Sequence, residues 1–441
     1  MPLSHNSILN KIITNISWLF FDKILRMVVG LVVVMWLARY LGPEQFGQLN
    51  FVIALISVFG VFATLGLKGI VIRDIIDTPE NRKVTLGTAF ILKFIASIIM
   101  YFLLLMTVFF VKNDDSLLQN LVAILGLSII FKSSDIVNYW FESQVNSRYV
   151  VLVENSTFLL FSVVKIMMLW QNADLVSFVW VMLFETVITA LVLLLVYGKV
   201  VLNPLHWKAT RARAKSLLND SWPLIISSAA WIIYTRIDQI MISEMLNDQA
   251  VGYYSAAIRL SEIANFIPMI IIFSIIPTIT PLRKTNLPLY QHRFQMTYDI
   301  VVGLMIIAAI TTTFMSSWII NLLFGADYIK AASVLTIHIW SAIFIAMATV
   351  SGKYLINEGL QKITMQRHLI GVLINIPLNY LVIPIYGIEG AALASLISLA
   401  FSNYIFDALT PKTRFCFLQK TRSFIGYGLI NNFWNRKYEQ K

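Results

Sequence analysis

The sequence predicts an all-α integral membrane protein with about twelve transmembrane helices in two six-helix lobes and with both termini in the cytoplasm. The first observation is composition: of 441 residues, 58% are hydrophobic and 13% are charged, whereas an ordinary soluble domain is about 45–50% apolar and about 25% charged. The second is a series of long apolar stretches, and the third is the placing of Lys and Arg between them. This composition argues against soluble enzymes, nucleic-acid-binding modules and disordered chains.

Twelve stretches reach the roughly 20 predominantly apolar residues that a helix needs to cross a bilayer. No small-residue cleavage pattern follows the first of them, so we interpret it as a membrane span and not as a signal peptide. The predicted spans are residues 16–38, 46–67, 84–111, 117–141, 149–170, 174–198, 217–246, 251–281, 296–324, 329–355, 363–386 and 388–408.

The basic residues between the spans predict the orientation of the chain. With the N-terminus in the cytoplasm, the cytoplasmic segments hold 23 Lys and Arg residues and the segments on the other side hold 3. Such an excess is the normal signature of cytoplasmic loops. It supports an even number of spans, and it explains the net charge of +11 without a nucleic-acid partner.

The longest polar connection divides the spans into six and six. We therefore predict an N-terminal lobe at 1–198, a basic cytoplasmic linker at 199–216, a C-terminal lobe at 217–410 and a basic cytoplasmic tail at 411–441. Two interpretations of the tail stay open. It lies on the inner membrane surface, where anionic headgroups attract its charges, or it is unstructured.

An internal repeat supports the two lobes. Residues 41–50 (LGPEQFGQLN) and 246–255 (LNDQAVGYYS) share a leucine, a polar turn, an apolar residue and a glycine at a constant offset of 205 residues. Because each predicted half has an even number of spans, the halves enter the membrane in the same sense. Their symmetry axis then lies along the membrane normal, and the cavity expected between them can open to either side.

Charged residues inside predicted spans usually face a water-filled cavity or a partner. Helical spacing predicts three local ion pairs, Asp22–Arg26, Lys132–Asp135 and Arg259–Glu262. The charges left over are the bases Lys23, Lys93, Lys165, Arg236 and Lys353 and the acids Glu154, Glu185 and Asp238. Any one of these residues can equally be a structural partner of another helix or reach the interface. For the set in spans one, seven and eight we favour a cavity, and a cationic cavity suits an anionic substrate such as a phosphate group.

Signals of catalysis and of bound cofactors are missing from the sequence. The single cysteine, Cys416, rules out an intrachain disulfide, and none of the five histidines has metal-ligand spacing to another His or to the Cys. There is no Walker A motif for nucleotide hydrolysis. We therefore expect no cofactor, no metal site and no enzymatic activity.

Several motifs resemble one family of transporters. Residues 36–49 (WLARYLGPEQFGQL) resemble the sequence that follows the first span of bacterial polysaccharide flippases, and Leu65–Leu67 with Arg73 and Asp74 resembles the end of their second span. Supporting resemblances occur at 236–242 (RIDQIMI), 252–257 (GYYSAA) and 386–392 (YGIEGAA). The family is that of the Wzx-type O-antigen or capsular repeat-unit flippases, in the superfamily that also holds the MATE drug exporters and the lipid II flippase MurJ.

The resemblance implies a bacterial inner-membrane protein with two lobes around a central cavity. Such proteins move an undecaprenyl-diphosphate-linked oligosaccharide from the cytoplasmic to the periplasmic leaflet by alternating access. The implied partners are this substrate, membrane lipids, the repeat-unit polymerase and the chain-length regulator.

The resemblance also implies which residues bind the substrate. In the family, basic residues of spans one, two, seven and eight face the cavity. Here the candidates are Lys23, Arg26, Arg236 and Arg259, and span two lacks an internal basic residue. The acids Asp22, Asp238 and Glu262 are counter-charges or ion-coupling residues, and the sequence does not choose between these roles.

Two other functions remain as alternatives. A MATE-like, cation-coupled exporter of small molecules would have a cavity dominated by acids, whereas here the unpaired bases outnumber the unpaired acids by five to three. A membrane glycosyltransferase or polymerase would need a large outward loop, and the predicted outward loops are short. The family motifs therefore favour the flippase.

Overall fold

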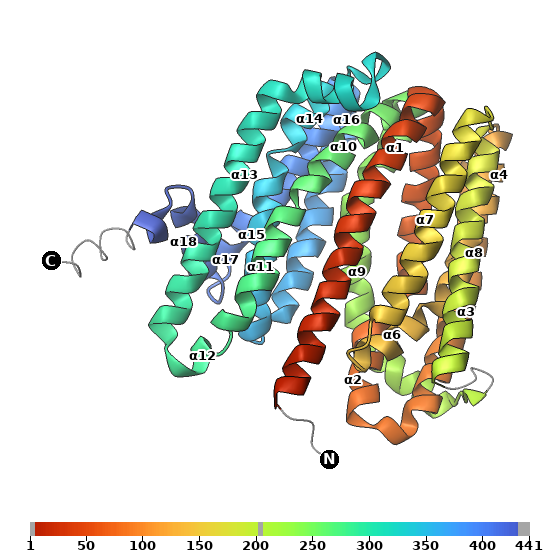
Figure 1. Cartoon of the computed structure of the whole chain (residues 1–441). Coiled ribbons are helices and arrows are strands. Elements are labelled where there is room, and N and C mark those ends of the chain that lie inside the picture. The colour runs from red at the N-terminus through yellow and green to blue at the C-terminus, as the bar shows by residue number, and fades with distance from the viewer. Residues whose placement is uncertain (1–4, 202–205, 431–441) are drawn as a thin grey trace. The chain divides into compact units, whose positions relative to one another are not determined.

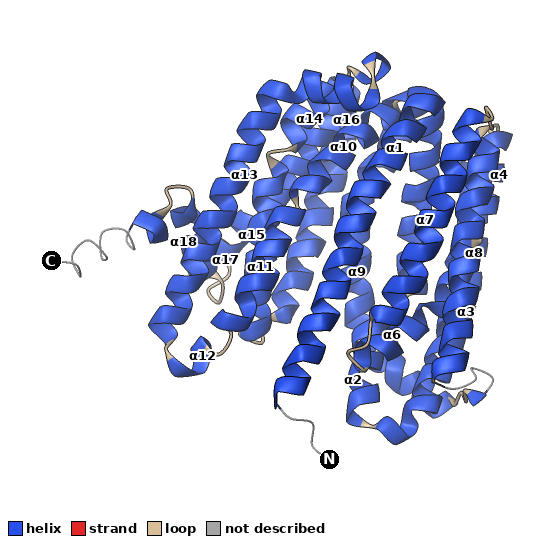
Figure 2. Cartoon of the chain, in the orientation of Figure 1, coloured by secondary structure: helices blue, strands red, loops and turns tan. Residues whose placement is uncertain are grey.

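The computed structural model describes residues 5–201 and 206–430, and within them every regular element is a helix (Figures 1 and 2). The predicted all-α fold is confirmed. The chain divides into two compact units, which are described separately below. Unit 1 consists of Met1–Leu41 and Gln48–Ile232, and unit 2 consists of Gly42–Gly47 and Ile233–Lys441. The sequence placed the boundary between its lobes earlier, at residue 217, whereas the division between the units falls inside a helix.

Unit 1 holds the first helices of the chain. They are α1 (His5–Ala63), α2 (Leu67–Asp77), α3 (Arg82–Val111), α4 (Ser116–Gly126), α5 (Ser128–Phe131), α6 (Ile136–Ser143), α7 (Arg148–Trp170), α8 (Leu175–Val200) and the first part of α9 (Arg211–Met245). Unit 2 holds the rest of α9, then α10 (Asp248–Ala264), α11 (Phe266–Ile279), α12 (Leu282–Thr285), α13 (Leu287–Phe324), α14 (Ala331–His338), α15 (Ser341–Asn357), α16 (Gln361–Ala400), α17 (Phe406–Leu409) and α18 (Arg414–Ser423).

Two glycines break helices that otherwise look continuous. Gly42 lies inside α1 with φ 71° and ψ 171°, and Gly387 lies inside α16 with φ 60° and ψ −136°. Glycine has no Cβ and adopts positive φ without strain. At the first break Pro43 follows directly, and proline suits the start of a helix. Each break falls where the sequence predicts the end of one span and the start of the next.

Within the described residues, nine helical segments are long and apolar enough to cross a membrane. The first and the last of them contain the breaks at Gly42 and Gly387. The charged helix α9 is not among the nine, although it is 35 residues long. The chain is therefore a multi-pass membrane protein, while the number of twelve crossings and the side on which the termini lie stay predictions.

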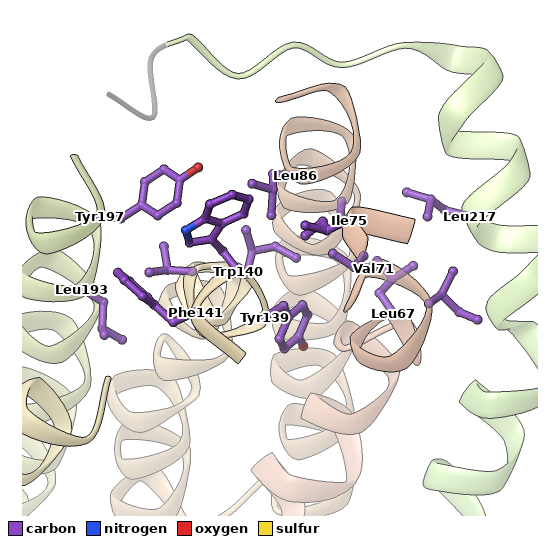
Figure 3. Packing of buried hydrophobic residues seen from close by; sticks show 14 of the residues in the cluster. Leu67, Val71, Ile75, Leu86, Tyr139, Trp140, Phe141, Leu193, Tyr197 and Leu217 are labelled. Carbon is purple, nitrogen blue, oxygen red and sulfur yellow. The ribbon is translucent and has the colours of Figure 1, made fainter. Parts of the chain in front are cut away.

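A hydrophobic core of aliphatic and aromatic side chains joins several helices of unit 1 (Figure 3). The amphipathic helix α2 begins after Gly66, which has φ 59°, and buries Leu67, Val71 and Ile75. These side chains belong to one buried cluster with residues 139–141 of α6 and Tyr197 of α8. The burial of this apolar surface holds α2 against the unit, because apolar area removed from water is the main stabilising term of a core.

The predicted linker is partly folded into unit 1. The backbone N–H of Lys208 donates to the carbonyl oxygen of Lys83 at 3.2 Å. Gly87 leaves room for the backbone at Lys208, because a Cβ at residue 87 would lie 2.4 Å from the Lys208 carbonyl oxygen. From Arg211 onward the residues are helical. Parts of the predicted basic linker, 199–216, are thus helical or packed on unit 1. Residues 202–205 of that range lie outside the described residues.

The two copies of the sequence repeat contact each other reciprocally in unit 2. A Cβ at Gly47 would lie 1.7 Å from the carbonyl oxygen of Asp248, and a Cβ at Gly252 would lie 1.9 Å from the carbonyl oxygen of Pro43. Under the 205-residue offset of the repeat, Pro43 corresponds to Asp248 and Gly47 corresponds to Gly252. Each of the two contacts is therefore the counterpart of the other. Such an exchange is the pattern of a local two-fold axis, and both positions require glycine because the backbones approach so closely.

The chain after the last predicted span also belongs to unit 2. Helix α18 buries Cys416 and Lys420, which have 0% exposure. Residues 414–423 are therefore a packed helix, which differs from the unstructured tail that the sequence left open. The remainder of the predicted tail, 431–441, lies outside the described residues.

Candidate functional site

In unit 1 the predicted site residues lie on α1. The guanidinium of Arg26 donates through Nε to Asp22 Oδ1 at 2.7 Å, which confirms the predicted pair. It also donates through Nη2 to Glu154 Oε2 of α7 at 3.1 Å, and Asn138 of α6 donates to the other oxygen of Glu154 at 3.0 Å. Lys23 lies on the same helix with an exposed side chain. Arg26 is thus held between two carboxylates, one of which the sequence had left without a partner.

The Arg26 cluster, defined as Arg26, Asp22 and Glu154, remains open. The three side chains are 33%, 12% and 27% exposed, respectively. Arg26 and Glu154 line a pocket of about 210 Å³ with Lys132, Asp135 and Glu185. Its ionisable lining therefore contains three carboxylates and two basic groups, so the lining of this pocket has no excess of basic residues. Asp135 does not form the predicted ion pair with Lys132 within the described residues.

Helix α7 carries a second ion pair that helical spacing could not predict. Lys165 Nζ lies 2.6 Å from Glu185 Oε2 of α8, and these side chains are 13% and 21% exposed. The sequence left both charges unpaired. This pair ties two neighbouring helices of unit 1 together, which is the structural role kept open for them.

In unit 2, one of the two predicted arginines pairs with a carboxylate. Arg236 Nη2 of α9 lies 3.6 Å from Glu262 Oε1 of α10. The predicted partner of Glu262 was Arg259, but within the part of the chain that the structure describes Arg259 forms no ion pair, although the charges of Glu262 and Arg236 both act on it. The side chains of Arg236 and Glu262 are 25% and 37% exposed. Two guanidinium groups against one carboxylate leave an excess positive charge at this place.

Asp238 lies in a different environment, although it is only two residues from Arg236. It is 3% exposed and is surrounded by neutral hydrogen-bond donors. Tyr254 Oη of α10 and Asn379 Nδ2 of α16 each donate to it at 2.6 Å, and the Ser395 hydroxyl of α16 donates as well. Asn379 Nδ2 also contacts Asn375 Oδ1 at 3.0 Å. Within the described residues, Arg236 pairs with Glu262 and forms no ion pair with Asp238.

The partners of Asp238 were missed by the sequence analysis. Asn375 and Asn379 are both completely buried, in the otherwise mostly apolar stretch 369–385 of α16. Two amides at i and i+4 lie on the same face of a helix, and buried polar side chains are normally paired. That spacing was the available signal, but it could not identify the carboxylate on α9.

A third ionic cluster was also missed. The Asp407 cluster consists of Asp407 of α17, Arg367 of α16 and Lys420 of α18. Arg367 Nη2 lies 2.6 Å from Asp407 Oδ1, and Lys420 Nζ lies 2.7 Å from Asp407 Oδ2. The side chains are at most 3% exposed. Lys420 also donates to the Asn403 carbonyl oxygen at 2.6 Å, and Arg367 Nη1 donates to the Ser351 hydroxyl at 2.8 Å. The sequence had counted Arg367 and Lys420 as loop and tail charges.

Comparison with known families agrees with the sequence motifs. The model of the family described as "Polysaccharide biosynthesis protein" matches residues 12–283, and the model described as "MatE" matches residues 223–381. The first match covers more than half of the chain.

The chain is also similar to individual proteins. It is 24% identical to the "Probable low-salt glycan biosynthesis flippase Agl15" of Haloferax volcanii, over 83% of this chain and 77% of that protein. It is 23% identical to the "Putative O-antigen transporter" of Shigella flexneri, over 92% of this chain and 98% of that protein. In structure it resembles the "Lipid II flippase MurJ, inward closed conformation", with a TM-score of 0.73 and 16% identity over 96% of this chain and 93% of that chain. At that identity the structural likeness shows the fold.

Proposed function

Because the chain belongs to the polysaccharide biosynthesis protein family, we propose that it is a flippase that moves a lipid-linked oligosaccharide across a membrane. The observation that carries the proposal is the similarity over most of their length to relatives named as a flippase and as an O-antigen transporter. The substrate is an undecaprenyl-diphosphate-linked repeat unit of O-antigen, capsule or a related polymer. It moves from the cytoplasmic to the periplasmic leaflet of a bacterial inner membrane by alternating access.

The diphosphate docks on the arginines of unit 2. Arg236 pairs with Glu262, whereas Arg259 forms no ion pair within the described residues, so one positive charge remains for the ligand. A guanidinium binds phosphate through two parallel hydrogen bonds. Lys23 and Arg26 are the corresponding basic residues of unit 1. Asp22 is the counter-charge of Arg26, and Glu262 is that of Arg236.

Asp238 is the candidate for ion coupling. It is an enclosed carboxylate that accepts hydrogen bonds from three neutral side chains, Tyr254, Asn379 and Ser395. Uptake of a proton or a sodium ion removes the cost of burying that charge. We expect Asp238→Asn, which keeps the size of the side chain, to abolish the dependence of transport on an ion gradient while diphosphate binding remains. Unchanged gradient dependence in this variant would exclude the coupling role.

The protein acts as a transporter and not as an enzyme in this proposal. No covalent bond of the substrate changes during flipping. The repeat-unit polymerase and the chain-length regulator are the partners that use the flipped substrate, and the surrounding membrane lipids hold the polyprenyl chain throughout.

Complementation tests the proposal directly. The chain is expressed in a bacterium whose own repeat-unit flippase has been deleted and which makes the matching lipid-linked oligosaccharide. We expect polymer on the cell surface from the parent chain, loss of polymer from Arg236→Ala and Arg259→Ala, and retention from Arg283→Ala. Arg283 is a suitable control because it forms an exposed pair with Glu358. Normal amounts of polymer from both Arg236→Ala and Arg259→Ala would exclude these arginines as the docking residues. If the parent chain inserts into the membrane and the sugar matches, but no polymer reaches the surface, the flippase function is excluded.

A second candidate is a MATE-like exporter of small cations. It is favoured by the MatE match over residues 223–381 and by the three carboxylates in the Arg26 pocket of unit 1. This function predicts increased resistance of cells to cationic drugs. Resistance without restored polymer would place the exporter ahead of the flippase.

A further inference from the structure

A pocket of about 320 Å³ in unit 1 borders the second half of α1, where the sequence shows no basic residue inside span two. Its polar lining comes from α1 and from neighbouring elements and includes Ser57, Thr64, Lys93, Ser97, Lys132 and Asp135. We propose that this pocket is a second anion-binding site, which takes a phosphate group through Lys93. This proposal deepens the proposed function and rests on it for one of the two sources of the phosphate group considered below.

Lys93 of α3 is an almost fully buried ammonium group, with 3% exposure. Its Nζ donates to the carbonyl oxygen of Lys132 at 3.1 Å and to Tyr139 Oη at 3.4 Å, and it lies 5.1 Å from the centre of the Tyr139 ring. An ammonium group has three donors. Within the described residues the third donor has no partner, and no carboxylate lies within ion-pair distance of Lys93.

Other enclosed lysines of the chain have a carboxylate beside them. Lys165 lies 2.6 Å from Glu185, and Lys420 lies 2.7 Å from Asp407. A buried charge without such a partner is strongly disfavoured, so proteins usually pair it. Lys93 departs from this rule at the wall of a pocket. A negatively charged ligand in that pocket would supply the missing partner.

The other groups in the pocket favour a phosphate group as the ligand. Lys132 has an exposed side chain, so two ammonium groups stand against the single carboxylate of Asp135 and leave an excess positive charge. Ser97 is buried and adds a hydroxyl group on the same helix as Lys93. Donors on two elements, α3 and the turn at Lys132–Asp135, suit an oxyanion whose oxygens point in several directions. A tetrahedral phosphate presents its oxygens in that way.

The pocket brings together polar side chains of two helices. Lys93 of α3 lines it beside Ser57 in the second half of α1 and Thr64 just after that helix. The phosphate group comes either from the diphosphate of the lipid-linked substrate or from an acidic phospholipid of the membrane.

Binding measurements on the full chain test the proposal. The protein is placed in nanodiscs of phosphatidylcholine, and inorganic pyrophosphate is the first probe. We expect Lys93→Met to weaken pyrophosphate binding by about tenfold or more, since a charge-assisted hydrogen bond is lost. The matched control is Lys68→Met, because Lys68 is 59% exposed and pairs with Glu142 outside the pocket. Equal affinity in Lys93→Met and Lys68→Met overturns the proposal.

Thermal unfolding excludes a merely structural role for Lys93. Removal of an unpaired buried charge should leave the melting temperature of Lys93→Met equal to or above that of the parent chain. Pyrophosphate should raise the melting temperature of the parent chain, because a ligand stabilises the state that binds it. Should Lys93→Met fail to fold, Lys93→Arg keeps the positive charge and is expected to retain pyrophosphate binding. The proposal is overturned if folded Lys93→Arg does not bind pyrophosphate and pyrophosphate does not raise the melting temperature of the parent chain.

Competition identifies the source of the phosphate group. Displacement of pyrophosphate by undecaprenyl diphosphate assigns the pocket to the substrate headgroup, and displacement by phosphatidylglycerol added to the nanodiscs assigns it to a membrane lipid. Both results support the anion site. The binding assay contains no transport step. If pyrophosphate binding depends on Lys93 but the chain fails complementation, the proposed flippase function is rejected and the anion site stands. If the chain restores polymer but pyrophosphate binding does not depend on Lys93, the second anion site is rejected and the flippase function stands.

Discussion

The Arg26 cluster of unit 1 and the Asp407 cluster of unit 2 are built from the same kinds of group but differ in enclosure. In the first, one guanidinium lies between two carboxylates and the side chains are 12–33% exposed. In the second, one carboxylate lies between two cations and the side chains are at most 3% exposed. The first borders a pocket, and the second is closed by additional hydrogen bonds to Asn403 and Ser351.

The difference indicates which cluster supports the fold and which is available to a ligand. An enclosed charge that loses its partner has no water to replace it, so a closed cluster is costly to disrupt. A partly exposed charge recovers hydration when its partner is removed. The Asp407 cluster therefore fastens α18 to α16 and α17, whereas the charged groups of the Arg26 cluster stay partly exposed at a pocket.

The largest effect is expected from Asp407→Ala. This change leaves Arg367 and Lys420 buried without their carboxylate, and we expect the free energy of unfolding to fall by about 3–5 kcal/mol. Denaturant unfolding of the purified chain in detergent measures it. A loss below about 1 kcal/mol, the range of an exposed pair, would contradict the structural role of the cluster.

The second effect depends on pH. Burial, reinforced by the charge of Arg367, lowers the pKa of Lys420 from its usual 10.5 to about 8. Between these values the unfolded chain binds a proton that the folded chain has released. The free energy of unfolding should therefore rise with pH over this window, on the order of 3 kcal/mol for this group.

Unfolding curves between pH 7 and pH 10.5 test this sign. The rise should disappear in Lys420→Met and persist in Lys412→Met, because Lys412 is exposed on the same segment. Parallel pH dependence of the parent chain and Lys420→Met would show that Lys420 keeps an ordinary pKa.

Arg26→Gln should separate transport from stability. We expect surface polymer in the complementation assay to fall about tenfold or more, as one charged contact is lost. The free energy of unfolding should change by no more than about 1 kcal/mol, because the guanidinium is 33% exposed. Lys68→Gln is the control that should retain transport. If transport falls only in proportion to the amount of folded Arg26→Gln protein, the Arg26 cluster is structural, like the Asp407 cluster.

The smallest effect is expected from Glu142→Gln. It removes the exposed pair with Lys68, whose side chains are 43% and 59% exposed at a separation of 2.9 Å. Exposed pairs contribute about 0.2–1 kcal/mol, so the unfolding midpoint should barely move. A loss comparable with that of Asp407→Ala would show that enclosure does not explain the contrast between the two clusters.

Much of the fold could be predicted from local features of the sequence. Apolar length predicts helices that span a membrane, and the glycines at 42 and 387 mark the breaks between spans because only local backbone conformation is involved. The pair of Asp22 and Arg26 was predictable for the same reason, since residues four apart meet on one face of a helix.

The partners across helices were not predictable. Glu262 had two arginines within reach, and helical spacing favoured Arg259, whereas the packing of α9 on α10 brings Arg236 to it. Asp407 meets Arg367 from 40 residues away and Lys420 from 13 residues away. Nothing in the spacing of charges predicts such contacts, because they depend on which helix faces pack together.

The sequence by itself determined the class of this protein, the breaks between its helices and its family. These properties follow from apolar length, from the freedom of glycine at positive φ and from motifs read along the chain. The tertiary structure alone decided which charges are enclosed, which pair between helices and which face a pocket. The physical reason is that the free energy of a charge depends on its surroundings in space, so an Arg–Asp pair belongs to a closed cluster at Asp407 and to an open one at Arg26.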